Sequence, residues 1–347
     1  MKFKVVLNNI ILILVSLTLA IFAAELICRF LSNSNDTDPT YKLEHPVLPF
    51  VMKPNSESVT LHGHTITINS HGLRDFEYPY QKPPGTFRIL VLGDSVGFAY
   101  GQDMQDGFAK VLERQLNAAK NKKYARIEVI NAAHNGFHIL DQYNYLRLYG
   151  LGYSPDALVV GVNSSHFAIE SQRMVIKDGV DFAPESLWLR LHVPPWVKRS
   201  LRNSYLYMTI GNAYRNRVSG GSNSNEIATV SEKDLKKTED LTLKKVADDL
   251  EKLLYLTSKN SLPIYLLYQP NRRETISRTY DSPPLLTQIR SLEKEGRLTF
   301  VDSITEFGKY EQNTNEIFPV NDGAHPNANG HKILAGRLFD QLIDKVQ

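Results

Sequence analysis

The sequence predicts an α/β fold, a three-layer α/β/α sandwich around a parallel, flavodoxin-like sheet. From residue 86 onward, short apolar runs alternate with longer segments of helical periodicity, which is the pattern of successive βαβ units. The run 157–162 (ALVVGV) is apolar throughout, as expected for a strand that helices cover on both faces of the sheet. The 347 residues are enough for one large domain with additions.

The predicted elements follow one another along this part of the chain. Strands are expected at 88–92, 127–131, 157–162, 262–268 and 298–301, and helices at 108–117, 140–149, 246–256 and 331–346. The stretch from about 164 to 240 interrupts this alternation and contains Trp188 and Trp196. We expect it to be an insertion over the carboxyl edge of the sheet, where long connections often form lids or binding elements.

The N-terminus has the composition of a membrane-spanning helix. Residues 10–24 are almost entirely apolar, Lys2 and Lys4 precede them, and the helical pattern continues to Leu31. With its apolar flanks the segment approaches the roughly 20 residues that span the hydrocarbon core. Basic residues before the segment predict a cytoplasmic N-terminus and an extracytoplasmic body. A cleaved signal peptide is the alternative, because the run 20–24 offers small residues to a peptidase.

Residues 32–85 read as a linker followed by a small β-hairpin. The stretch 32–39 is polar and turn-rich, and the runs 59–61 and 65–68 alternate around His62 and His64. No cysteine or acidic cluster accompanies these histidines, so they are interpreted as exposed hairpin residues and not as metal ligands. The predicted organisation is an anchor at 1–31, this region at 32–85, and one domain at 86–347 with the insertion.

Charge and cysteine content exclude some classes of function. The formal net charge is +3, and the basic pairs along the chain are interpreted as solvated faces, so no nucleic-acid partner is expected. Cys28 is the single cysteine, which excludes a disulfide within the chain.

Residues 91–97, VLGDSVG, allow two interpretations. Gly93, Ser95 and Gly97 fit G-x-S-x-G, the strained turn that carries the nucleophilic serine of α/β-hydrolases. The same letters contain Gly-Asp-Ser directly after an apolar strand. Both interpretations place Ser95 at the carboxyl end of that strand, so the other catalytic groups must decide between them.

A candidate base and its partner lie near the C-terminus. Of the ten histidines, only His325 has an aspartate, Asp322, three residues before it. That spacing lets one short turn direct the carboxylate to Nδ1 of the ring while Nε2 faces a serine. Gly136 and Asn163 follow the second and third predicted strands, so they converge with Ser95 at the carboxyl edge of the sheet. Their amides, with that of Ser95, can stabilise an oxyanion.

These residues resemble the SGNH, or GDSL, hydrolase superfamily, membrane-anchored bacterial type. The blocks are Gly93-Asp94-Ser95, Gly136, Gly161-x-Asn163 and Asp322-x-x-His325, in the family's order. Residues 68–74 (INSHGLR) also look like the segment that precedes the domain in anchored members. The resemblance implies Ser95, His325 and Asp322 as catalytic triad, and Ser95, Gly136 and Asn163 as oxyanion hole. It implies no metal and no cofactor. The third block departs from the family pattern, because Ser164 stands where an aspartate is usual. In this interpretation Gly97 matches G-x-S-x-G by chance.

Three functions are compatible with this pattern. The first is an extracytoplasmic serine esterase or deacetylase acting on an acyl, most simply acetyl, ester of a glycan or lipid. The second is an O-acetyltransferase that passes the acyl group to a sugar hydroxyl of a polysaccharide, served by a membrane-bound acyl carrier or transferase. The third is a non-catalytic membrane-tethered partner protein. The first two share serine chemistry, so the motifs do not separate them.

Overall fold

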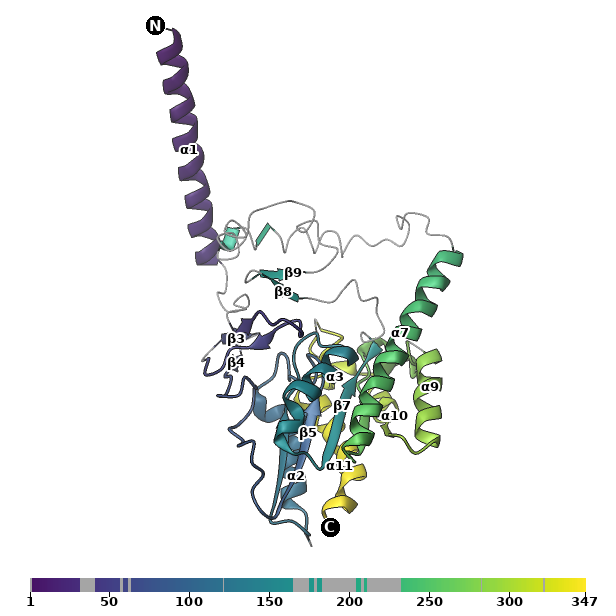
Figure 1. The fold of residues 1–347 in the computed structure, drawn as a ribbon. Helices are drawn as coiled ribbons and strands as arrows, with labels where there is room; N and C mark the ends of the chain where they lie inside the picture. Colours follow the sequence, from purple (N-terminus) through teal and green to yellow (C-terminus); the bar gives the residue numbers. More distant parts are fainter. Residues whose placement is uncertain are drawn as a thin grey trace.

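The structure is a computed structural model of the 347-residue chain. It describes residues 2–31, 41–56, 59–61, 64–120, 122–164, 175–177, 180–182, 204–206, 209–210, 232–281, 283–320 and 322–347. Figure 1 shows an α/β domain from which a long N-terminal helix projects.

Five parallel strands form the central sheet. They are β5 (Thr86–Leu92), β6 (Arg126–Asn131), β7 (Ala157–Val162), β10 (Ile264–Tyr268) and β11 (Thr299–Val301). Their spatial order is β11-β10-β7-β5-β6, so the strands taken in chain order are arranged 2-1-3-4-5, the flavodoxin-like order. The predicted fold class is therefore confirmed. The strand order reverses between β5 and β7, and the carboxyl ends there border the crevice in which such sheets bind ligands.

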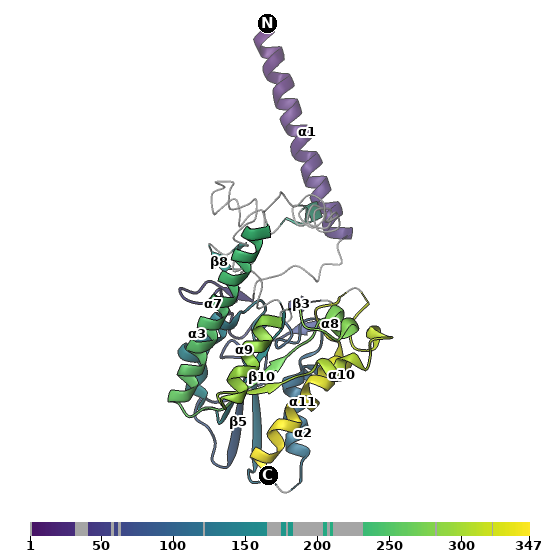
Figure 2. The same cartoon turned by 90° about the vertical axis from the view of Figure 1, so that its right-hand side faces the viewer.

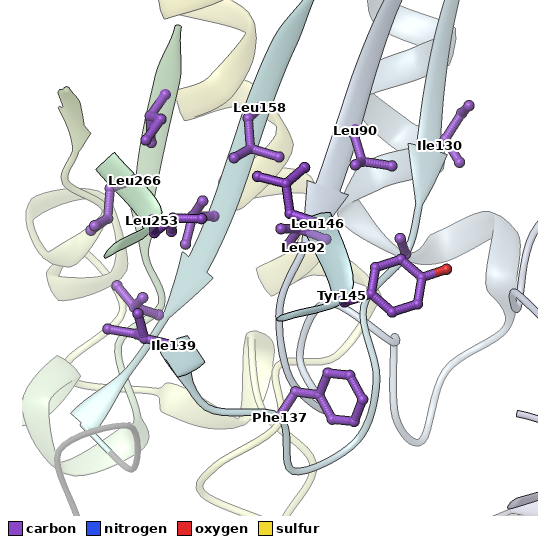
Figure 3. Close-up of a cluster of buried hydrophobic side chains, with 14 of the residues drawn as sticks. Leu90, Leu92, Ile130, Phe137, Ile139, Tyr145, Leu146, Leu158, Leu253 and Leu266 are labelled. Atoms are coloured by element: carbon purple, nitrogen blue, oxygen red, sulfur yellow. The ribbon is translucent and has the colours of Figure 1, made fainter. Parts of the chain in front are cut away.

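Helices cover both faces of the sheet (Figure 2). One face carries α3 (Ile139–Leu148), α7 (Glu232–Lys259) and α9 (Pro283–Lys294), and the other carries α2 (Phe108–Ala118) and α11 (Ala328–Val346). Leu90, Leu92 and Leu158 point to the α3 side (Figure 3), whereas Ile89 and Val91 point to the α2 side. This alternation is the period-2 geometry of a strand buried on both faces.

The segment before β5 belongs to the same core. It contains β1 (Lys42–Leu43), β2 (Val51–Met52), β3 (Val59–Leu61) and β4 (His64–Ile66). β3 and β4 pair antiparallel, as the hairpin prediction requires. Phe50, Ile68 and Tyr78 are buried in the cluster that contains Leu90 and Leu92. Residues 41–80 therefore do more than link the anchor to the domain, because they cover one side of the sheet.

The N-terminal helix α1 (Lys2–Leu31) lies apart from this core. Its segment Val6–Phe30 spans 25 residues with a mean hydropathy of 2.7, and none of its most apolar window is buried. By length and composition it can cross a membrane, as a single anchor or as a signal sequence.

Every element predicted from residue 86 onward is present, with ends shifted by a few residues. The exception is α7, which begins at Glu232 and so includes the end of the expected insertion. Residues 232–240 are mostly Glu, Lys and Leu without Gly or Pro, so the helix extends through them. α8 (Arg272–Ser277), α9 and α10 (Ile304–Gly308) are further helices that the periodicity does not predict. Trp188 and Trp196 lie outside the described residues.

Close packing after β5 explains Gly97. A Cβ atom at this position would lie 2.6 Å from Cβ of Ala133 and 3.4 Å from Cα of Gly93. Real Cβ atoms do not approach a neighbouring carbon so closely, so the turn can lie against the end of β6 only if residue 97 has no side chain. The backbone of Ser95 has no positive φ, whereas a strained α/β-hydrolase elbow would call for one. Glycine is thus needed at position 97 because a side chain would collide with Ala133. The observed turn fits the Gly-Asp-Ser interpretation.

We predict that Gly97→Ala destabilises the domain by about 1–3 kcal/mol, because the added methyl overpacks the contact with Ala133. Gly336→Ala is the matched control. Gly336 lies within α11, and a Cβ atom added there would meet no neighbour within 4 Å, so this change is expected to stabilise the helix by up to about 1 kcal/mol. Thermal unfolding of both full-length variants in detergent measures the difference. Equal stability of the two variants would contradict the packing explanation.

Candidate active site

The turn that follows β5 presents Ser95 at the carboxyl edge of the sheet. The Asp94 side chain accepts a hydrogen bond from the backbone N–H of Val96 at 2.9 Å, which fixes the start of the turn. The carbonyl oxygens of Asp94 and Ser95 then accept the N–H groups of Phe98 and Tyr100, each at 2.9 Å. The turn is therefore held by its own backbone and by one buried carboxylate.

Ser95, His325 and Asp322 form a continuous hydrogen-bonded chain. His325 Nε2 lies 2.9 Å from Ser95 Oγ, and His325 Nδ1 lies 2.7 Å from Asp322 Oδ2. The other Asp322 oxygen accepts the backbone N–H groups of Ala324 at 2.8 Å and His325 at 3.0 Å. One short turn thus directs the carboxylate to one ring nitrogen while the other nitrogen faces the serine. This arrangement can activate a serine hydroxyl for nucleophilic attack.

The environment of Asp322 keeps its carboxyl group ionised. Partial burial, the largest single effect, raises the pKa. The hydrogen bond and charge of His325, together with the amides of Ala324 and His325, outweigh burial and lower the pKa of Asp322 to about 2. An ionised carboxylate in this position can orient the imidazole so that Nε2 faces Ser95.

Gly136 and Asn163 follow the strands on either side of β5. Gly136 has φ of +73°, a conformation that favours glycine, in a turn closed by the Phe137 N–H and the His134 carbonyl at 3.1 Å. Asn163 Nδ2 donates to Asp94 Oδ2 at 2.6 Å, which brings its side-chain amide beside the turn of Ser95. All three candidate oxyanion donors therefore lie at strand ends on one edge of the sheet.

The loop that carries Asp322 and His325 is clamped by Arg272 at the start of α8. The Arg272 N–H donates to the Gly323 carbonyl at 2.7 Å, and its guanidinium donates to the Pro319 carbonyl at 2.5 Å. Asn271, the N-cap of α8, donates to Ser164 Oγ at 3.0 Å. Ser164, the departure from the family pattern, therefore joins the end of β7 to the loop after β10.

Two further features of the described residues border the site. The Tyr100 ring packs against the His325 ring, with centroids 4.7 Å apart. An open pocket of about 640 Å³ lies beside the Asp322–His325 turn, between Gly323 and Ala324 on one side and α8, including Ile276, on the other. Within the described ranges, no group of three or more His, Cys, Asp and Glu side chains could hold a metal ion.

Arg74 stabilises the backbone that follows Ser95. It belongs to residues 68–74, the segment that resembles the one preceding the domain in membrane-anchored SGNH hydrolases. Its guanidinium donates to the carbonyl oxygens of Phe98, Ala99 and Gln102 at 3.0, 2.8 and 2.7 Å. Only 2% of Arg74 is exposed, and its charge also lies 5.1 Å from the Phe98 ring centroid. Ala99 has φ of +60°, so these bonds stabilise a backbone conformation that alanine disfavours.

The contacts made by four residues are not predicted from the sequence, namely those of Asp94, Tyr100, Arg272 and Arg74. Asp94 could have been noted, because it precedes the serine within the Gly-Asp-Ser block. Arg74 could have been noted as the one charged residue of its apolar and turn-forming segment. The other two have no local signal, because their partners are brought close only by the fold.

We predict that Arg74→Lys slows the reaction of Ser95 with a fluorophosphonate probe by about 10- to 100-fold, because a small displacement of the turn misplaces the nucleophile. Lysine keeps the charge but cannot supply the forked donors of arginine. Arg88→Lys is the matched control. Arg88 is equally buried near the amino end of β5 and donates to Glu128 and to the Tyr153 carbonyl, away from the site.

Both lysine variants are expected to lose about 1–3 kcal/mol of stability through unsatisfied carbonyl groups. Only Arg74→Lys is expected to slow labelling of the protein that remains folded by circular dichroism. If the two variants label equally fast, Arg74 has a purely structural role.

Comparison with known proteins gives similarity to solved structures. No protein-family model and no curated protein matches the sequence. The chain is similar to a lipase/acylhydrolase from Enterococcus faecalis, with 15% identity, a TM-score of 0.43, and coverage of 75% of this chain and 97% of that one. A lipolytic protein of the G-D-S-L family from Veillonella parvula has 11% identity and a TM-score of 0.41, with coverage of 73% of this chain and 97% of that one. A catalytic mutant of the acetylxylan esterase Axe2 from Geobacillus stearothermophilus has 14% identity and a TM-score of 0.41, with coverage of 74% of this chain and 94% of that one.

Proposed function

We propose that this chain is a serine esterase that hydrolyses an acyl ester, with Ser95 as nucleophile, His325 as general base and Asp322 as the group that orients His325. The observation that carries the proposal is the chain of two hydrogen bonds, 2.9 and 2.7 Å long, at the point where the strand order reverses. Nucleophile, base and orienting carboxylate are therefore each within the reach that the chemistry requires.

The reaction proceeds through a covalent ester. His325 takes the proton of Ser95 Oγ as the oxygen attacks the ester carbonyl carbon. The tetrahedral intermediate collapses when His325 returns that proton to the leaving oxygen, which departs as the alcohol. Water then gives a proton to His325 and attacks the acyl carbon, which releases the acid and restores the Ser95 hydroxyl.

The backbone amides of Ser95 and Gly136 and the side-chain amide of Asn163 are the proposed oxyanion donors. All three are neutral N–H donors that the fold holds in place, and such donors stabilise charge that develops in the transition state. The bond from Asn163 to Asp94 supports this role because it fixes the orientation of the amide group before substrate binds.

Among the residues that the structure describes, solvent access favours hydrolysis over acyl transfer. The side chains of His325 and Asp322 are 22% and 32% exposed, so water can reach the base beside the acyl-enzyme. A transferase must keep water away from that intermediate. We therefore place the acetyltransferase second.

We further propose that α1 is retained as a membrane anchor and that the domain lies outside the cytoplasm. The exposed apolar length of α1 and the basic residues Lys2 and Lys4 before it support this topology. An enzyme in this position meets acyl esters, such as acetyl esters, of glycans and lipids, and these are the proposed substrates.

We expect Ser95→Ala to reduce the hydrolysis of 4-nitrophenyl acetate by about 10⁴-fold or more, because loss of a triad nucleophile removes the covalent route. A fluorophosphonate probe should label the wild-type protein and fail to label the variant. Ser303→Ala, at a buried serine two residues after β11, is the control and should keep its labelling. Persistent labelling of Ser95→Ala would place the nucleophile elsewhere, and an unlabelled, inactive wild type would support the non-catalytic alternative.

Asn163→Ala is expected to lower kcat by about 10²–10³-fold with little change in KM, because an oxyanion donor acts mainly in the transition state. Steady-state kinetics on the same ester separates the two constants. A variant that raises KM and leaves kcat unchanged would assign Asn163 to substrate binding and remove it from the oxyanion hole.

A further inference from the structure

We infer that the carboxyl edge of the sheet, with Ser95 and His325, faces the lipid surface in which α1 is anchored, so that the ester substrate reaches the site from the membrane side. The inference rests on the proposed function, since it takes α1 as a retained anchor. It adds an orientation that anchoring alone does not impose, because a tethered domain can present any face to the bilayer.

The chain enters the domain beside the site. Tyr41 is the first described residue after α1, and its ring stacks on Phe98 with centroids 6.2 Å apart. Its hydroxyl accepts a hydrogen bond from Asn135 Nδ2 at 3.3 Å. Phe98 belongs to the turn of Ser95, and Asn135 directly precedes Gly136. The anchor is therefore connected to the edge that carries the candidate triad.

The length of the connection restricts the other orientations. Ten residue steps join Leu31 to Tyr41, which span at most about 35 Å when fully extended. α11 begins two residues after Pro326, next to the site, and its 19 residues cover about 28 Å toward the far end of the domain. With that far end on the membrane, the connection would have to run nearly straight along the whole depth of the domain. With the site edge on the membrane, the connection from Leu31 to Tyr41 needs to span only a small part of its extended length.

A second contact involves the base of the anchor, where residues 204–206 lie against α1. There the Glu25 carboxylate accepts hydrogen bonds from Ser204 Oγ at 2.8 Å and from two backbone amides at 3.0 Å. The Arg29 guanidinium lies 5.0 Å from the ring centroid of Tyr205. Figures 1 and 2 both show α1 on the side of the domain opposite the C-terminus.

Apolar side chains at the rim agree with this orientation. Val320 is 74% exposed and lies two residues before Asp322, and Ile276 is 54% exposed at the pocket beside Ala324. Apolar groups at a lipid surface lose contact with water when they enter the interfacial region, which stabilises the arrangement.

Energy transfer between the domain and labelled lipid tests the orientation. The single native cysteine is removed by Cys28→Ser, and one new cysteine is introduced by Val320→Cys at the site edge or by Asp344→Cys near the end of α11. Asp344 is exposed and lies at the far end of the domain, where Gln347 Nε2 donates to the Lys120 carbonyl at 3.1 Å. Each full-length variant carries a donor fluorophore in phosphatidylcholine–phosphatidylglycerol vesicles whose outer leaflet contains rhodamine-labelled phosphatidylethanolamine.

We expect transfer from position 320 to be several times more efficient than from position 344. Equal efficiencies, or a higher efficiency from position 344, would overturn the orientation while leaving the proposed esterase and its anchor intact. Loss of transfer from both positions, with the protein released from the vesicles, would overturn the anchor and the orientation together. A correct gradient in a protein that fails to react with fluorophosphonate would leave the orientation standing and overturn the esterase.

Discussion

The carboxylate of Asp94 joins the ends of the two strands between which the sheet changes direction. One oxygen accepts the amide of Val96 after β5, and the other accepts the side-chain amide of Asn163 after β7. Asp94 is only 4% exposed, and a buried carboxylate is costly unless hydrogen bonds compensate it. Those bonds are available only when both strand ends are correctly placed. The position of Ser95 relative to Asn163 is thus coupled to the register of β5 and β7.

A second group of buried charges fixes the segment that covers the sheet. Lys110 of α2 forms an ion pair with Asp75 at 2.7 Å, and the other Asp75 oxygen accepts the amide of Asn131 at 2.6 Å. Asn131 in turn donates to the Gly97 carbonyl at 2.9 Å. Buried ion pairs contribute little net stability, but removal of one partner is strongly destabilising. Arg74 directly precedes Asp75, so this network and the Arg74 guanidinium together hold the backbone that follows Ser95.

The fold and the proximity of Ser95, His325 and Asp322 could be predicted from sequence because their signals are local. Apolar periodicity marks each strand, and parallel strands bring their carboxyl ends to one edge, so residues 230 positions apart such as Ser95 and His325 can be expected to meet. Asp322 and His325 are themselves close in sequence. The supports of the site leave no such signal, because Arg74 binds carbonyl oxygens 24 to 28 positions away, and any residue supplies a carbonyl oxygen. The start of α7 could not be predicted from apolar periodicity either, because residues 232–240 are mostly charged and continue the helix beyond its apolar face.

In the proposed function, a short tether changes how the substrate meets the site. The pocket beside the Asp322–His325 turn is lined by small residues such as Gly323 and Ala324 and by longer side chains of α8 such as Arg272 and Ile276. Binding that is weak in solution becomes sufficient when enzyme and ester are held at one surface, because a tether of a few nanometres gives an effective concentration on the order of millimolar. Binding energy is then not needed to collect substrate and can be used in the transition state, where the proposed oxyanion donors near Ser95 would act. The constraint is geometric, since a connection of ten residue steps allows this only if it enters the domain beside the proposed nucleophile, as it does at Tyr41.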